Sequence, residues 1–129
     1  MIVVDANVVA YSYLPGEYTE AAEGLLENHP EWAAPVLWRT EFLNILVGYL
    51  RRGNLNFEQA QALQLEGLLA GAEFEVDSRS VLELVRDSDC SAYDGEFIAL
   101  AMKLETKLVT MDKKLLRAFP KCAVALDKI

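Results

Sequence analysis

The sequence predicts an α/β fold with three layers, in which a central, mostly parallel sheet is flanked by helices. Short apolar runs alternate with longer segments of helical periodicity, as in strand–helix–strand units. The N-terminal run of Ile2, Val3 and Val4 is continuously apolar, which is typical of a strand buried on both faces. With 129 residues, 53% of them hydrophobic, the chain has the size and apolar content of a single domain spanning residues 1–129.

Two helices are expected directly after this first strand. The first covers residues 8–14, with Asn7 as a suitable cap and Pro15-Gly16 as the break that ends it. The second covers residues 17–28 and is amphipathic, with three side chains turned inward: Ala21, Leu25 and Leu26. The pattern then predicts three further elements of the N-terminal half, namely a short edge strand at 32–35 and helices at 38–52 and 57–69.

The C-terminal half continues the alternation of strands and helices. Ser78 or Ser80 can cap a helix that runs to about Asp87, and Ser91 can begin another. In order, the expected elements are a strand at 72–76, this capped helix, a helix at 91–105, a strand at 107–110, a helix at 112–119 and a strand at 123–126.

Charge and composition limit the classes of function. The 12 basic and 20 acidic residues give a net charge of -8, which argues against broad, non-specific binding to phosphate backbones. His29 is the single histidine, so a zinc site with several histidines is excluded, and a surface loop is its expected place. Cys90 and Cys122 are expected to be free thiols in a reducing cytoplasm. No apolar run approaches the roughly 20 residues that span a membrane.

Four acidic residues stand out by their position. Asp5 and Asp112 each lie just beyond the carboxyl end of a predicted strand, and ligands of open α/β sheets bind at the carboxyl ends of the strands. Glu41 and Asp94 lie near the starts of helices, on or beside the apolar stripes that face the core. A carboxylate turned toward a core is costly unless it is paired or bound to a metal.

Each of these acids also has a purely structural explanation. Asp112 can cap the helix that follows it, and Ser91 and Asp94 have the spacing of a capping box. Glu41 can interact with the positive end of its own helix. Taken singly, these explanations are favoured. Capping does not require four acids to face one crevice, however, whereas a divalent-metal site does, so the joint pattern indicates a site for Mg²⁺ or Mn²⁺.

Four segments resemble the motifs of a PIN domain, in order and in rough spacing: Val3-Val4-Asp5-Ala6-Asn7-Val8, Thr40-Glu41-Phe42, Ser91-Ala92-Tyr93-Asp94 and Leu108-Val109-Thr110-Met111-Asp112. The resemblance spans nearly the whole chain. It is strongest to the small toxins of VapBC-type toxin–antitoxin pairs, which are metal-dependent ribonucleases.

The resemblance implies a function and a set of site residues. Asp5, Glu41, Asp94 and Asp112 would be the catalytic, metal-binding acids, with Mg²⁺ or Mn²⁺ as the cofactor. Three polar residues would support them: Asn7, Ser91 and Thr110. The implied partners are a single-stranded RNA substrate, a small antitoxin and a second copy of the chain, since the helices at 38–69 are apolar enough to bury against a second subunit. The chain departs from the family at Gly95, where alanine is common, and at Leu115 and Leu116, where some relatives carry a further acid or amide.

Two further groups of residues are candidates for contacts to RNA. Lys113, Lys114 and Arg117 follow Asp112 and are expected to contact the RNA backbone, although a solvated helix face explains them equally well. Three tyrosines offer faces on which bases could stack, namely Tyr11, Tyr13 and Tyr18. Burial in the core or in a subunit interface is the favoured explanation of these rings.

The function best supported by the sequence is therefore hydrolysis of single-stranded RNA by a toxin of a toxin–antitoxin pair. One alternative is a PIN nuclease of RNA processing or DNA repair, which the chain alone does not separate from a toxin. Another is a non-catalytic PIN-like interaction module, against which the intact acid set argues. A phosphate-accepting receiver domain fits poorly, because a single Asp5 follows the first strand.

Overall fold

Five parallel strands form the central sheet of the computed structural model, which describes residues 1–129 except for the side chains of Leu69 and Ala70. Their order across the sheet is β3-β2-β1-β4-β5. The strands described are β1 (Ile2–Val4), β2 (Trp32–Pro35), β3 (Ala72–Phe74), β4 (Leu108–Thr110) and β5 (Ala123–Ala125). The predicted α/β class is confirmed, and every described pair of neighbouring strands is parallel.

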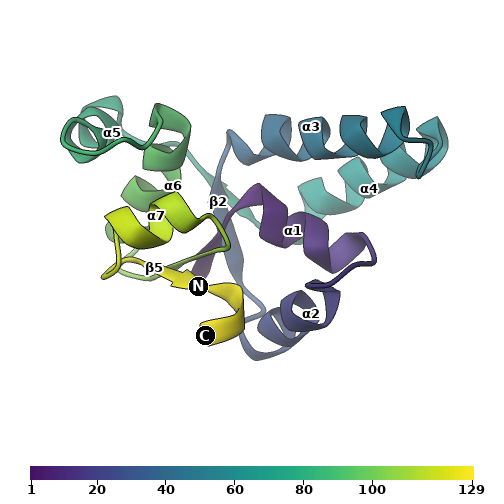
Figure 1. The fold of residues 1–129 in the computed structure, drawn as a ribbon, viewed down its shortest axis with the longest axis horizontal. Helices are drawn as coiled ribbons and strands as arrows, with labels where there is room; N and C mark the ends of the chain where they lie inside the picture. Colours follow the sequence, from purple (N-terminus) through teal and green to yellow (C-terminus); the bar gives the residue numbers. More distant parts are fainter.

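Helices cover both faces of this sheet. Figure 1 shows α1 and α2 on one side of the strands and α5 and α6 on the other. The described helices are α1 (Ala6–Tyr13), α2 (Thr19–Asn28), α3 (Trp38–Arg51), α4 (Phe57–Ala70), α5 (Ser78–Val85), α6 (Ala92–Lys103), α7 (Lys113–Ala118) and a final 3₁₀ turn, η1 (Leu126–Lys128). Among the described residues, no helix combines the length and the apolar character needed to cross a membrane.

The sequence indicated that the strand at 32–35 lies at the edge of the sheet. This prediction is wrong, because the strand lies inside the sheet. β2 lies between β1 and β3, and Ala33 of β2 pairs with Ala72 of β3. The edges are β3 and β5 instead. All four residues of β2 are buried, as expected for a strand with a neighbour on each side and helices above and below.

Two local predictions differ from the structure near helix starts. Helix α1 begins at Ala6 with Asp5 as its cap, so Asn7 lies inside the first turn and does not cap it. Helix α5 is capped by Asp77, whose Oδ2 accepts the Ser80 N–H at 3.0 Å. Asp, Asn and Ser are all good caps, so the sequence alone does not choose between neighbours of these types.

The inward face of α2 also differs from the prediction in one position. Leu25 is buried as expected, and Ala21 is partly buried. Leu26 is 41% exposed, whereas Ala22 is fully buried in its place. The apolar stripe of this helix is therefore centred on residues 22 and 25, a spacing that holds one narrow face toward the core.

The register of the central strands brings two predicted site residues together. Val4 of β1 lies opposite Val109 of β4, so the next residues along the two strands, Asp5 and Thr110, are neighbours at the carboxyl edge of the sheet. Both are buried. The core beneath them is fully buried and apolar, and it includes Val3, Val4, Ile98, Leu108 and Val109. This packing fixes the backbone from which the candidate site projects.

Candidate active site

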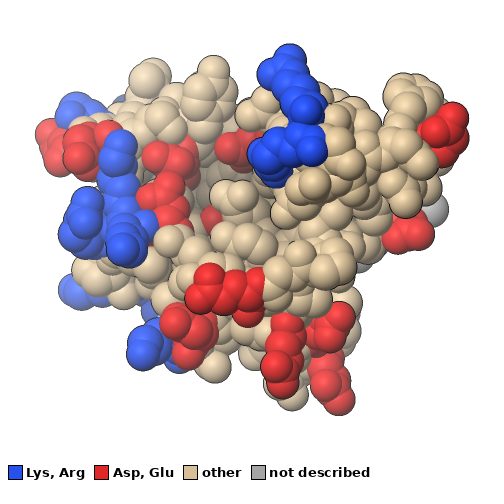
Figure 2. All heavy atoms as spheres, turned by 45° about the vertical axis from the view of Figure 1, so that its right-hand side comes forward, with Lys and Arg blue, Asp and Glu red and all other residues tan. Residues whose placement is uncertain are grey.

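A cavity of about 270 Å³ opens at the carboxyl ends of the central strands. Its lining includes the four acids that the sequence singled out, which come from separate parts of the chain: Asp5, Glu41, Asp94 and Asp112. Figure 2 shows acidic side chains around a hollowed part of this face, with Lys and Arg side chains beside them. The fold therefore brings together residues that are up to about a hundred positions apart in the sequence.

Asp5 is held in place by hydrogen bonds to both of its carboxylate oxygens. The Val8 N–H donates to Oδ1 at 2.9 Å, and the Thr110 hydroxyl donates to Oδ2. The same Thr110 oxygen accepts the Asp112 N–H at 3.0 Å. Thr110 thus links two of the four acids, and its hydrogen bonds explain how a polar residue is fully buried here.

Glu41 lies in the first turn of α3 and points toward the other acids. Its Oε1 is buried and has no hydrogen-bond partner among the described residues. Burial, together with the negative charges of Asp5, Asp94 and Glu96, raises the pKa of Glu41 to about 7. A buried carboxylate oxygen without a donor is destabilising, so this atom is in the state expected of a ligand for a positively charged group.

Asp94 and Asp112 both make the helix-capping contacts that the sequence allowed. The Ser91 N–H donates to Asp94 Oδ2 at 3.2 Å and the Asp94 N–H donates to Ser91 Oγ at 3.1 Å, which completes a capping box. Asp112 Oδ1 accepts the N–H groups of Lys114 and Leu115 at 2.9 and 3.3 Å. Both acids nevertheless line the cavity, and the other oxygen of each makes no hydrogen bond within the described part of the chain.

The electrostatics of the cavity favour a cation. Burial, together with the charge of Asp112, raises the pKa of Asp5 to about 6, although the hydrogen bonds from Thr110 and Val8 lower it. None of the ion pairs found among the described residues involves any of the four acids. Each of these acids lies at the N-terminal end of a helix, where the positive end of the helix dipole partly offsets its charge.

The donor set fits a hard divalent cation such as Mg²⁺ or Mn²⁺. All four candidate ligands offer carboxylate oxygens, which these ions prefer, and Glu41 Oε1 lacks any other partner among the described residues. Within the described residues, no three His, Cys, Asp or Glu side chains are already close enough to hold a metal ion. Asp94 and Asp112 are drawn toward the N–H groups of their own helices, so closing around a cation requires these side chains to rotate.

A family model described as PIN domain matches residues 2–120 of the chain. The chain belongs to the PIN domain family. It is 34% identical over 128 residues to "Ribonuclease VapC3" of Pyrobaculum aerophilum, an alignment that covers 92% of this PIN domain and 95% of the relative. Both findings confirm the resemblance to PIN domains that the four sequence motifs indicated.

Two solved structures share the fold of this PIN domain. The protein PAE2754 from Pyrobaculum aerophilum superposes with a TM-score of 0.77 at 21% identity, over 98% of this chain and 89% of the other. A toxin–antitoxin complex from Klebsiella pneumoniae contains a chain that superposes with a TM-score of 0.73 at 18% identity, over the full length of both chains. At these identities the likeness establishes the fold alone.

The other predicted site residues of the PIN domain lie around the cavity. Asn7 lines it from the first turn of α1, and its side chain is exposed. Lys113, Lys114 and Arg117 are exposed on α7, beside Asp112, and do not line the cavity. Their exposure agrees with both explanations of these three cations, which are a solvated helix face and a contact surface for RNA.

Sequence reasoning missed one polar residue that lines the cavity and one that lies near it. Asn44 lies in α3 one turn after Glu41 and lines the same cavity. Its three-residue spacing from Glu41 was the signal that could have found it. Glu96, two residues after Asp94, does not line the cavity, but it is partly buried and its charge contributes to the raised pKa of Glu41.

Proposed function

We propose that this PIN domain is a divalent-metal-dependent endoribonuclease that hydrolyses phosphodiester bonds of single-stranded RNA, and that it is the toxin of a toxin–antitoxin pair. One observation carries the proposal: four carboxylates line one cavity without a cationic partner among the described residues. The relative named "Ribonuclease VapC3" supports RNA as the substrate. The solved toxin–antitoxin complex from Klebsiella pneumoniae supports the biological role.

Each acid has a separate task in the proposed mechanism. Asp5, Asp94 and Asp112 hold Mg²⁺ or Mn²⁺ through their carboxylate oxygens. A divalent ion held by these residues would supply a water of lowered pKa and a positive charge for the reaction. Thr110 fixes Asp5 by its hydrogen bond, so that this ligand keeps one orientation.

Glu41 is the residue proposed to handle the proton of the attacking water. Its pKa of about 7 in the metal-free protein lies in the range that suits a general base at neutral pH. Its Oε1 has no competing hydrogen bond among the described residues, so it is free to orient a water or to bind the metal directly. Asn44, on the same face of α3, is placed to donate a hydrogen bond to the substrate.

The substrate must approach a protein with a net charge of -8. We assign the first contact with the RNA backbone to Lys113, Lys114 and Arg117, because they are exposed on α7 next to Asp112. Contacts of this kind position a strand without reading its sequence. They would place the phosphate beside the acids, where a bound cation neutralises both sets of negative charge.

Two protein partners belong to the proposal. A small antitoxin is expected to cover the cavity and block cleavage. A second copy of the chain is expected at the helix pair α3–α4, where large apolar side chains are exposed: Leu43, Phe57 and Leu65. A role in RNA processing or DNA repair remains the alternative, and a non-catalytic module is the second.

The test is cleavage of single-stranded RNA with Mg²⁺ or Mn²⁺ by the wild type and by Asp5→Asn. Asparagine keeps the helix cap but removes the charge, so activity should fall by about a hundredfold or more while the fold persists. Asp77→Asn is the matched control, because Asp77 also caps a helix and does not line the cavity. Equal cleavage by wild type and Asp5→Asn would refute the assigned chemistry.

The same assay separates the alternatives. Cleavage of DNA in preference to RNA would favour a repair nuclease. Absence of cleavage together with absence of any Mn²⁺-induced rise in melting temperature would favour the non-catalytic module, because a ligand that binds the folded state must stabilise it.

A further inference from the structure

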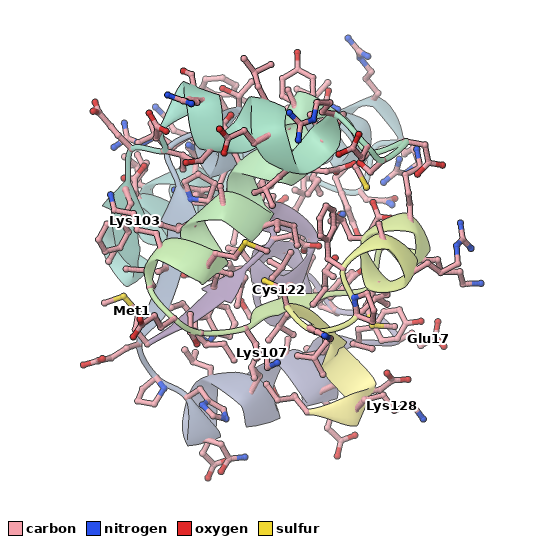
Figure 3. The ribbon with its side chains drawn as sticks, turned by 90° about the vertical axis from the view of Figure 1, so that its left-hand side faces the viewer. Met1, Glu17, Lys103, Lys107, Cys122 and Lys128 are labelled. Carbon is pink, nitrogen blue, oxygen red and sulfur yellow. The ribbon has the colours of Figure 1, made fainter. Side chains whose placement is uncertain are left out.

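A second cavity adjoins the acidic one. Its volume is about 250 Å³, and it shares two lining residues, Asn7 and Ile45, with the cavity that holds the four acids. Figure 3 shows Glu17, which lines the second cavity, on the same side of the molecule as α7, whose Leu115 lines the first. The two hollows are therefore neighbours on one face.

Three tyrosines dominate the wall of the second cavity. They are contributed by α1, by the start of α2 and by α3: Tyr11, Tyr18 and Tyr49. The rings of Tyr11 and Tyr18 lie 5.1 Å apart between centroids, at an angle of 43°. All three side chains are only partly buried, so ring surface remains open to the cavity.

The loop between α1 and α2 gives this cavity a fixed shape. The Thr19 hydroxyl donates to the Leu14 carbonyl at 3.0 Å and accepts the Gly16 N–H at 2.8 Å. The Thr19 N–H also donates to the Gly16 carbonyl at 3.3 Å. Because these bonds close the loop on itself, Glu17 and Tyr18 are presented by a structured turn.

A positive charge lies beside one of the three tyrosine rings. The guanidinium carbon of Arg52 lies 4.8 Å from the centroid of the Tyr49 ring. Gly48 leaves room for the guanidinium, because a Cβ there would lie 3.1 Å from Arg52 Nη1 and the side chain would have to shift slightly. A guanidinium beside an aromatic ring is suited to a phosphate and to a stacked base at once.

We infer that the cavity of Tyr11, Tyr18 and Tyr49 is a subsite for one base of a single-stranded RNA, next to the scissile phosphate. The inference rests on the proposed nuclease function and adds to it a defined place for the substrate. Ring faces with a carboxylate (Glu17) and an amide (Asn7) nearby match a flat heterocycle with polar edges, and match an aliphatic side chain less well.

The subsite also accounts for a requirement for single strands. A base can enter the tyrosine cavity only when it is not stacked within a duplex. The strand would cross from the cations of α7, over the acids, to Arg52, so that positive groups lie at both ends of the path. In a protein of net charge -8, this is a local route for a polyanion.

The experiment measures binding of short, fluorescently labelled RNA oligonucleotides to the Asp5→Asn protein by anisotropy, with one abasic position moved along the strand. In the Asp5→Asn protein, one abasic position should weaken binding by about fivefold to a hundredfold, as expected for the loss of one stacked base. Adding Tyr18→Leu or Tyr49→Leu should weaken binding by a similar factor, and the abasic position should then have no further effect.

Two comparisons guard against a general loss of folding. Tyr18→Phe keeps the ring and should keep the affinity. Tyr13→Leu removes a tyrosine that packs against Phe42, 6.2 Å away, and that does not line the subsite, so it should leave affinity unchanged. The melting temperature of each variant is measured in parallel.

The outcomes separate the subsite from the nuclease. The subsite is overturned if Tyr18→Leu and Tyr49→Leu both bind the RNA with full affinity. It is also overturned if the affinity is the same whichever position of the strand is abasic. Both results would count even if the wild type cleaves RNA. Failure of the Asp5→Asn protein to bind any oligonucleotide overturns it as well. A third outcome is that the abasic position no longer lowers the affinity of the leucine variants, while the wild type cleaves no RNA. This outcome supports the subsite and rejects the nuclease function.

Discussion

Glu41 is the residue at which the stability of the metal-free fold and the proposed chemistry conflict most directly. Its carboxylate is drawn into a cavity with three other acids, and Oε1 has no donor among the described residues. The ordinary pKa of 4.5 rises to about 7 in the folded protein. Nothing in the fold alone requires this residue, since an apolar side chain would complete the stripe of α3. The proposed function would explain the placement, because it needs a carboxylate there.

The raised pKa of Glu41 gives a pH dependence with a definite sign. Between about pH 4.5 and 7 the folded state keeps a proton that the unfolded state has lost, so stability falls as the pH rises through this window. Asp5, whose pKa rises from 3.8 to about 6, acts in the same direction at lower pH. In EDTA, Glu41→Gln should therefore stabilise the protein at pH 8 by about 1 kcal/mol, or roughly 4 °C in melting temperature, and much less at pH 4.5.

Thermal melting at several pH values checks this prediction. Glu58→Gln is the matched control, because Glu58 also lies in the first turn of a helix but is exposed. It should leave both the melting temperature and its pH dependence unchanged. A Glu41→Gln protein that melts lower than the wild type at pH 8 in EDTA would show that the carboxylate has a stabilising partner.

At the scale of single residues, the sequence identified the acids but not all their surroundings. Asp5 and Asp112 could be placed because a strand end followed by an acid has one location in a parallel sheet. Thr110 could be named only by resemblance, since its hydrogen bond to Asp5 joins two strands far apart in the chain. Asn44 was missed because an exposed asparagine within a helix carries no signal of its own.

At the scale of elements, the contact between α5 and α6 sets the position of Asp94. Gly95 lies where the two helices meet, and a Cβ there would lie 2.6 Å from Val85 Cγ1 and 3.1 Å from Val81 Cγ1. The glycine therefore allows a close helix approach that the alanine common in the family would not allow without a shift. Because Asp94 directly precedes Gly95, the spacing of these helices bears on the cavity.

Gly95→Ala should accordingly destabilise the protein, despite the higher helix propensity of alanine. Overpacking of this kind costs about 1–3 kcal/mol, measured as a shift of the urea midpoint. The double variant Gly95→Ala/Val85→Ala should recover part of the loss by removing the clashing methyl group. Gly24→Ala is the control: no atom lies within 4 Å of a Cβ there, so it should stabilise α2 by up to about 1 kcal/mol. Stabilisation by Gly95→Ala would contradict the close packing.

The kinds of element were predictable, whereas the order of the strands was not. Short apolar runs and capped helical segments are local signals, and they placed the strands and helices close to their observed positions. The neighbours of β2 are set by pairing between residues about forty positions apart, such as Ala33 with Ala72. No local pattern distinguishes a short buried strand inside the sheet from one at its edge.

At the scale of the whole molecule, the exposed apolar residues of α3 and α4 bear on the proposed dimer. Leu65 is 56% exposed on α4, and Leu43 and Phe57 are exposed on the same helix pair. If a second copy covers this surface, light scattering at micromolar concentration should give twice the mass of the chain. Leu65→Glu should then shift the protein to monomers, because a charge would be buried in the interface.

Leu82→Glu is the matched control for the dimer. Leu82 is 66% exposed on α5, outside the proposed contact, so the variant should keep the mass of the wild type. A wild-type protein that scatters as a monomer would remove the second subunit from the proposal and leave the acidic cavity unaffected.

The N-termini of four helices lie at the same cavity, and this affects how inactive variants of the protein would behave. Asp5, Glu41, Asp94 and Asp112 each stand at the cap or in the first turn of a helix, at the positive end of its dipole. A protein in which all four acids are replaced by amides would thus not be an inert copy. Its cavity would lose its negative charge but keep the positive ends of four helix dipoles, so it would favour sulfate or phosphate over cations. Tight RNA binding by such a protein would then say little about natural recognition.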